Sequence, residues 1–283
     1  MKASEFASKL GNTLKSVVKM AVSSRPVRLH HPISAERRRT LIVLANGPSL
    51  NKTLSESADT LKRNDCLSVN FAPLSNIFFD IRPRFHVLAD PLFFSKEPPV
   101  NVEELYNKLA RVVWPMTLLI PHNFRNRINQ AVSNNPNISI VFFNFVGLEG
   151  FEWFENMAYN TRLGMPRPRN VLIPAIMCGI WLGYKRIYIT GADHSWMQTI
   201  SVDENNNVIS VQPHFYKDDK KEQQRVDTTY RNYRLHDIVH SFYVAFRSYH
   251  LLQRYAQKKG VEIINSTPGS FIDAFPRGTL QRF

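Results

Sequence analysis

Polar residues that could bind a phosphorylated ligand follow several apolar runs of the sequence. Asn46, Asn70, Asp90 and Asp193 each stand where a short apolar run ends. In open parallel sheets the carboxyl ends of the strands meet at one edge, and ligands bind in the crevice there. Any one of these residues could instead begin a turn or cap a helix. Their recurrence at several strand ends nevertheless predicts a shared binding site.

The turn at residues 46–49 adds two further groups to this site. Gly47 allows the backbone to approach a ligand closely, and a helix predicted to begin near Ser49 would offer unpaired N–H groups to a phosphate. The turn is neither a Walker A loop nor a Gly-x-Gly-x-x-Gly motif, so it does not predict ATP or NAD.

His236 and His240 lie four residues apart on a predicted helix, which places both imidazoles on one face. Such a pair could supply a general base near neutral pH, bind a metal, or lie on a solvated surface. Zinc requires a third ligand and often a neighbouring Glu, and the sequence offers neither at a suitable spacing. We therefore predict no metal site at this pair, and leave the catalytic and surface roles open.

The pattern of apolar residues indicates how these groups are positioned. Strands are predicted at residues 40–45, 67–70, 85–90, 117–120, 138–143, 186–190 and 261–265. Helices are predicted around residues 125–128, at 171–182 and at 235–259, with an irregular cap at 145–168 and a mobile lid insertion at 198–234. This order predicts an α/β fold with a Rossmann-like, mostly parallel sheet, flanking helices and a small lid.

The first 39 residues differ from the rest. Residues 3–22 have apolar side chains at helical spacing with lysines between them, which predicts a basic amphipathic helix. Residues 23–39 form a predicted linker, and the catalytic domain is expected at 40–283. The helix could lie on an anionic membrane, dock on the domain, or make a contact in a homo-oligomer.

The amino-acid composition indicates which binding partners and which cellular compartment to expect. The chain has 283 residues and a formal net charge of +13, which favours a polyanionic partner such as a nucleic acid, an anionic membrane or a phosphate-rich substrate. The basic residues are dispersed and no recognition motif is present, so nucleic acid is disfavoured. The two cysteines lie in apolar segments, which predicts buried thiols in a reducing compartment. No run of about 20 apolar residues and no signal peptide is evident, so we expect a cytoplasmic protein, with peripheral contact to the inner membrane face left open.

Several blocks together resemble the bacterial lipo-oligosaccharide sialyltransferases. The similarity rests on residues 44–50, Asn70, residues 88–94, residues 178–193 and the His-x-x-x-His pair, in that order and at similar spacing. The Asn-Gly-Pro-Ser and Leu-Gly-Tyr-Lys blocks are equally similar to the pterin diphosphokinase-like domain of motility-accessory glycosyltransferases. The match covers roughly residues 40–95 and 165–275.

The resemblance implies a glycosyltransferase that moves a sugar from a nucleotide-activated donor, such as a CMP-linked acidic sugar, to a surface polysaccharide or lipid-linked glycan. It implies inversion at the anomeric carbon, His240 as the base, and no metal requirement. The donor-binding residues that it implies are Asn46, Gly47, Ser49, Asn70, Asp90 and Arg169.

This sequence differs from the sialyltransferase pattern at two places, and both differences leave the identity of the donor sugar undecided. His194, Ser195 and Trp196 follow Asp193 where that family has phosphate-stabilising tyrosines, and Tyr216 in the predicted lid would have to substitute. Asp90 replaces an Asn, and its carboxylate would repel a phosphate unless it were paired or bridged by a cation. The alternative is a diphosphokinase-like phosphotransferase that uses ATP and Mg²⁺, with Asp90 and Asp193 as metal ligands.

Overall fold

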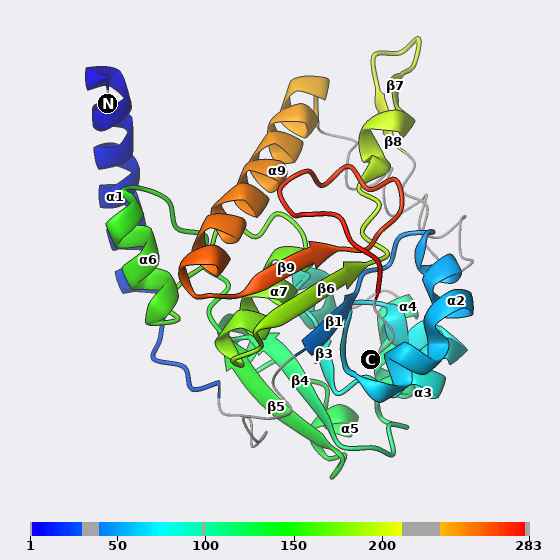
Figure 1. The fold of residues 1–283 in the computed structure, drawn as a ribbon. Helices are drawn as coiled ribbons and strands as arrows, with labels where there is room; N and C mark the ends of the chain where they lie inside the picture. Colours follow the sequence, from blue (N-terminus) through cyan, green and yellow to red (C-terminus); the bar gives the residue numbers. More distant parts are fainter. Residues whose placement is uncertain (1, 30–39, 98–99, 211–232, 281–283) are drawn as a thin grey trace.

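Seven parallel strands form one sheet in the order β5-β4-β3-β2-β1-β6-β9 (Figure 1). The computed structural model describes residues 2–29, 40–97, 100–210 and 233–280. The predicted α/β fold with a parallel sheet is confirmed. The strands are β1 (Thr40–Leu44), β2 (Asp65–Val69), β3 (Phe85–Val87), β4 (Met116–Pro121), β5 (Ile138–Phe143), β6 (Arg186–Thr190) and β9 (Glu262–Asn265).

The order in which strands are added to the sheet reverses at β1. The chain adds β2 to β5 one after another on one side, and then returns to place β6 and β9 on the other side of β1. Val43 of β1 accordingly pairs with Leu67 of β2 and with Ile189 of β6. Such a reversal opens a crevice at the carboxyl ends of the strands, where ligands bind in folds of this class.

Helices cover both faces of the sheet. The helices are α1 (Ala3–Ser23), α2 (Leu50–Arg63), α3 (Asn76–Ile81), α4 (Val100–Leu109), α5 (Gln130–Ser133), α6 (Glu152–Asn160), α7 (Leu172–Trp181) and α9 (Leu235–Lys258). Successive side chains of β1 point to opposite faces. Leu41 and Val43 share a core cluster with α7 and α9, whereas Ile42 and Leu44 pack with α2.

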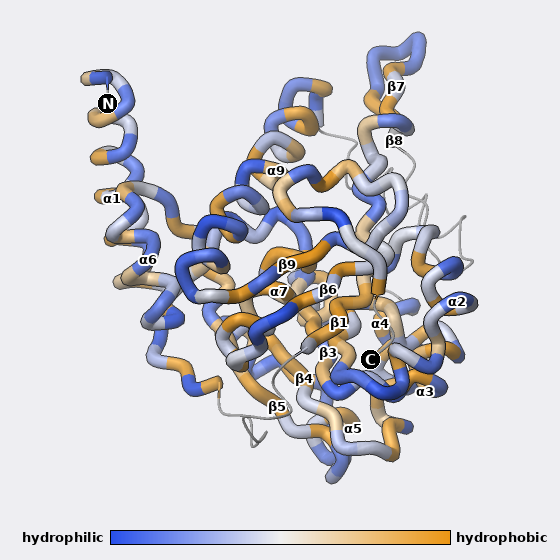
Figure 2. The backbone as a smooth tube through the Cα atoms, viewed as in Figure 1, coloured by the Kyte–Doolittle hydropathy of each residue, from blue (hydrophilic) through white to orange (hydrophobic). Residues whose placement is uncertain are grey.

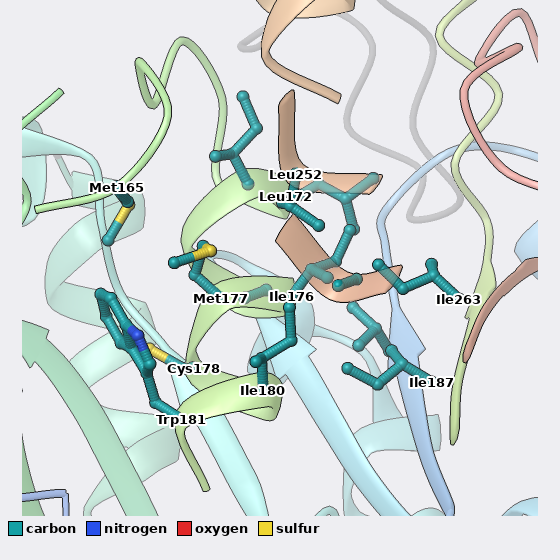
Figure 3. Close-up of a cluster of buried hydrophobic side chains, with 14 of the residues drawn as sticks. Met165, Leu172, Ile176, Met177, Cys178, Ile180, Trp181, Ile187, Leu252 and Ile263 are labelled. Carbon is teal, nitrogen blue, oxygen red and sulfur yellow. The ribbon is translucent and has the colours of Figure 1, made fainter. Parts of the chain in front are cut away.

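The helix α7 is the centre of the larger core. All ten of its residues are buried, which explains the uninterrupted apolar run that predicted a helix here. Figure 3 shows its side chains beside Ile187 of β6, Ile263 of β9 and Leu252 of α9. Cys178 lies in this core, and Cys66 is buried on the other side of the sheet; both are free thiols, as expected.

Three predicted segments differ in detail from the structure. The segment predicted as an irregular cap contains the helix α6, whose Glu152 and Glu155 stabilise its first turn. The helix predicted around residues 125–128 is replaced by a single 3₁₀ turn, η3 (His122–Phe124), and by α5. The predicted lid begins with the 3₁₀ turn η4 (Ser195–Thr199) and the hairpin of β7 (Ile200–Val202) and β8 (Val208–Ser210), while residues 211–232 lie outside the described residues.

The first helix packs on the sheet domain through small polar residues. Ser16 Oγ donates to the Glu149 carbonyl at 2.7 Å, and Phe151 N–H donates to Thr13 Oγ1 at 2.9 Å. After the helix, Ser24 Oγ hydrogen-bonds the Leu163 carbonyl at 2.5 Å. The predicted linker therefore begins as an ordered segment on the domain, and residues 30–39 lie outside the described residues. None of the described helices is long and apolar enough to span a bilayer.

Candidate functional site

A cavity of about 350 Å³ lies at the carboxyl ends of β1, β2, β3 and β6. This is the place where the order of the strands reverses. The sheet topology therefore brings together residues that are far apart in the sequence. The predicted donor-binding residues that line the cavity are Asn46, Gly47, Asn70, Asp90, Arg169 and Asp193.

Gly47 holds the loop after β1 against the loop after β6. Its N–H donates to the Gly191 carbonyl oxygen at 2.8 Å. A Cβ at position 47 would lie 2.0 Å from Asp193 Oδ2 and 2.6 Å from that carbonyl oxygen. Since such distances are far shorter than a van der Waals contact, only glycine fits here. The close approach predicted for Gly47 exists, and its partner is another part of the chain.

The carboxylate of Asp193 occupies the N-terminus of α2. Ser49 Oγ donates to Asp193 Oδ2 at 2.8 Å, and the Ser49 N–H approaches the same oxygen at 3.4 Å. A negative charge at this position is stabilised by the helix dipole. The groups of Ser49 that we expected to meet a phosphate therefore meet an internal carboxylate, and Ser49 is not part of the cavity lining formed by the described residues.

Asn70 and Asp90 follow β2 and β3, and both are held by the backbone. Asn70 has φ 47°, a left-handed conformation that Asn tolerates better than most residues, and its N–H donates to the Val87 carbonyl at 2.9 Å. Asp90 Oδ1 accepts the Leu92 N–H at 2.9 Å and caps the 3₁₀ turn η2 (Pro91–Phe94). Asp90 is therefore a cap and a cavity-lining residue at once.

Three amide side chains of the cavity have a buried polar atom without a hydrogen-bond partner among the described residues. These atoms are Asn46 Oδ1, Asn70 Oδ1 and Asn170 Nδ2. Each such atom costs about 1–3 kcal/mol when it stays unsatisfied. Native proteins keep few of these groups, and they concentrate where a ligand or an ordered water completes the hydrogen bonding. Their clustering around one cavity supports a polar ligand.

Arg169 lines the cavity, and two further basic residues, Lys19 and Arg167, lie close enough for their charges to interact. The pKa of Lys19 is lowered, first by burial and then by the charges of Arg167 and Arg169. Lys19 Nζ also donates to the Gly147 carbonyl at 3.2 Å. Because Arg167 forms an ion pair with Glu149 at 3.1 Å, Arg169 is the basic residue of the cavity lining that an anionic ligand would meet.

His194 is a cavity residue that the sequence did not identify as part of the site. It directly follows Asp193, adopts a left-handed conformation with φ 53°, and is buried. Its Nε2 lies 2.6 Å from the hydroxyl of Tyr249 on α9, and that hydroxyl donates to Asn170 Oδ1 at 2.9 Å. Strained backbone conformations of this kind cluster at functional sites. The available signal was the position of His194 next to a strand end.

The hydrogen bonds fix the tautomer of His194. Asn170 Oδ1 also accepts the Leu172 N–H at 3.1 Å, which sets the orientation of the amide. The single proton of the Tyr249 hydroxyl is directed to Asn170, so His194 Nε2 must carry the hydrogen and donate to that hydroxyl. Burial lowers the pKa of His194 to about 3. His194 is therefore a neutral imidazole at neutral pH, with Nδ1 as its basic nitrogen.

Comparison with known proteins gives a likeness of fold. No family model matches the sequence, and no curated protein is similar to it at a significant level. Among solved structures, the MAf glycosyltransferase from Magnetospirillum magneticum AMB-1 superposes with a TM-score of 0.52 at 12% sequence identity. The match covers 100% of this chain and 40% of that chain, so this protein spans about two fifths of its length. The likeness is one of fold, and it concerns the part of that glycosyltransferase that the superposition covers.

The predicted histidine pair lies outside the cavity lining that the described residues form. His236 and His240 are on the first turns of α9, and both are exposed to solvent. The ring of His240 stacks beside that of Tyr243 with centroids 6.2 Å apart, and His236 lies 3.4 Å from Asp237. The catalytic role of the pair therefore stays a prediction.

Two further expectations concern the lid and a metal. Tyr216, expected to stabilise the leaving phosphate, lies outside the described residues. Asp90 and Asp193, the Mg²⁺ ligands of the phosphotransferase alternative, both line the cavity. Within the described parts of the chain, no three His, Cys, Asp or Glu side chains gather closely enough to hold a metal ion.

Proposed function

We propose that this protein is a glycosyltransferase that binds a nucleotide-activated sugar in the cavity at the ends of β1, β2, β3 and β6. The observation that carries the proposal is the cluster of unsatisfied amide atoms of Asn46, Asn70 and Asn170 in this cavity, because bases and sugars offer matching donors and acceptors. The glycosyltransferase-like fold and the resemblance of the strand-end motifs to sialyltransferases support the same chemistry.

The donor that we propose is a CMP-linked acidic sugar. Arg169 in the cavity lining, with the charge of Lys19 nearby, favours a ligand that carries a phosphate and a carboxylate. Asp193 does not oppose this charge strongly, since its Oδ2 is held by Ser49. Asp90 is the residue that limits where the phosphate can lie, because a carboxylate accepts hydrogen bonds and repels an anion.

The reaction would be a direct displacement. The acceptor hydroxyl attacks the anomeric carbon, a new C–O bond forms, and the bond from that carbon to the phosphate oxygen breaks with inversion. The nucleotide leaves with the electron pair, and the hydroxyl proton passes to a base, which we propose is His240. The acceptor is a surface polysaccharide or lipid-linked glycan, which places the reaction in the cytoplasm at the inner membrane face.

A nucleotide-binding experiment on an Asn46 variant tests the proposal. Thermal unfolding would be followed with CMP, CDP, UDP, GDP, ADP and ATP, each with and without Mg²⁺. We expect CMP to raise the Tm without metal, and Asn46→Ala to weaken CMP binding about tenfold or more, because a buried amide partner is lost.

A matched control is Asn64→Ala, at the opposite end of α2, where the side chain donates only to the Thr60 carbonyl within the described residues. This variant should keep the full response to CMP. Stabilisation by ATP alone, and only with Mg²⁺, would instead favour the phosphotransferase. If no nucleotide changed the Tm, the cavity would not be a nucleotide site.

A further inference from the structure

The helix α1 contacts the domain mainly through polar side chains, and adds an apolar contact near each end, Phe6 with Phe151 and Met20 with the core. Thr13 and Ser16 are its buried residues, and Ser16 Oγ both donates to the Glu149 carbonyl and accepts the Glu149 N–H at 3.0 Å. Lys19 extends this polar contact to Gly147. An amphipathic helix normally packs its apolar stripe on the core. In α1 most of the apolar side chains face solvent instead.

The opposite side of α1 exposes a row of apolar side chains. The exposed fractions of Leu14, Val18 and Val22 are 60%, 65% and 69%. Their spacing by four residues places them along one face of the helix. Figure 1 shows α1 at the edge of the molecule, and Figure 2 shows that hydrophobic residues recur along its length. The exposed apolar side chains of α1 are Phe6, Leu10, Leu14, Val17, Val18 and Val22.

The charges beside this row are almost all positive. Lys2, Lys9, Lys15 and Lys19 stand between the apolar residues, and Glu5 is the only acidic residue of the helix. Lys9 forms a 3.2 Å ion pair with Glu5, which leaves a surplus of positive charge. A second copy of α1 would bring two basic helices together, whereas an anionic surface would neutralise them.

We propose that α1 is a peripheral membrane-binding helix whose apolar face enters the surface of a bilayer that contains anionic phospholipids. A helix of 21 residues is about 30 Å long and would lie along the interface, with Lys2 and Lys15 among the headgroups. The helix keeps its polar contact with the domain in this arrangement, so binding needs no unfolding.

The helix α1 also approaches one residue of the cavity. Lys19 on α1 is near enough to Arg169 for their charges to interact, and Arg169 lines the cavity. The membrane contact itself does not depend on what the cavity binds.

Vesicle flotation of the full chain tests the proposal. The wild-type protein should float with vesicles that contain phosphatidylglycerol, and bind pure phosphatidylcholine vesicles more weakly. Replacing Leu14 and Val18 together by Glu should lower the partition coefficient about tenfold or more, because charge replaces apolar contact in the interface. Raising the salt concentration should also weaken binding.

The matched control is Val113→Glu, which adds a charge at an exposed valine outside α1 that is 73% exposed. It should float like the wild type. Since the replaced side chains point to solvent, the Tm of all variants should stay close to that of the wild type. Equal binding of wild type and Leu14→Glu/Val18→Glu would overturn the proposal. So would a wild-type dimer that does not float and becomes monomeric in the double variant.

Discussion

A catalytic histidine needs both a position at the substrate and the ability to exchange protons with solvent. His194 has the first property, and His240 has the second. His194 lines the cavity but is buried, and its pKa is lowered to about 3. His240 is exposed on the first turns of α9, outside the cavity lining that the described residues form. The neutral imidazole of His194 and its bond to Tyr249 suit a residue that positions Asn170, whereas proton transfer suits a solvated histidine.

Kinetics of two variants separate these roles. We expect His240→Ala to lower kcat by about 100-fold to 10,000-fold, the usual contribution of a general base, while nucleotide affinity is retained. His194→Ala should mainly weaken nucleotide binding, because Tyr249 and Asn170 lose their fixed positions. Measurement of donor consumption and of the Kd for CMP checks both. The opposite pattern would assign the base to His194.

Buried histidines should make the protein sensitive to mild acid. Burial lowers the pKa of both His86 and His194 to about 3. Below the usual histidine pKa of about 6.5 the unfolded chain binds protons that the folded chain does not, so stability falls as the pH falls toward 3. Between about pH 7 and pH 5 each group should remove roughly 2 kcal/mol from the free energy of unfolding.

Urea unfolding at the two pH values measures this effect. His194→Asn should reduce the pH-dependent loss by roughly 2 kcal/mol, the contribution of this one histidine, whatever its effect on stability at pH 7. The exposed His240→Asn serves as the control and should keep the full loss. An unchanged pH dependence in His194→Asn would show that this imidazole is protonated in the folded protein.

At the scale of elements, the contact between the loops after β1 and β6 depends on the absence of a side chain at position 47. Gly47→Ala would place a Cβ 2.0 Å from Asp193 Oδ2. We expect a loss of about 1–3 kcal/mol in the free energy of unfolding, because the loops must separate. Gly11→Ala is the control, since a Cβ there meets no atom within 4 Å. That substitution should stabilise α1 by up to about 1 kcal/mol. Urea denaturation of both variants tests the difference.

The sequence predicted the helices and strands whose apolar pattern is local. It did not predict the features that depend on contacts with distant parts of the chain. Continuous apolar runs predicted β1 and α7 because both are buried on all sides. Strand-end residues predicted the cavity because parallel strands share one edge. The spacing of apolar residues and lysines predicted that α1 has an apolar and a polar face, but it did not indicate which face contacts the domain. His194 was not assigned to the site because its role depends on Tyr249, a contact across 55 positions of the sequence.

At the scale of the whole molecule, one buried residue, Glu149, connects three segments that are distant in the sequence. Glu149 is 5% exposed, and its carboxylate forms ion pairs with Arg247 of α9 at 2.8 Å and with Arg167 at 3.1 Å. The carbonyl and the N–H of Glu149 both form hydrogen bonds with Ser16 Oγ of α1. Glu149 therefore links the N-terminal helix, the segment before α7 and the long helix α9. Removing one partner of such a network leaves the other charges uncompensated.

The position of β1 in the middle of the sheet also affects how the protein is made. While the chain is being synthesised, β1 can pair with β2 early, but its other edge remains open until β6 (Arg186–Thr190) emerges. At about 5–20 residues per second this delay is on the order of 10 seconds. An open, apolar strand edge is a template for aggregation. The nascent chain is therefore an expected client of chaperones during this interval, even though the finished sheet buries that edge completely.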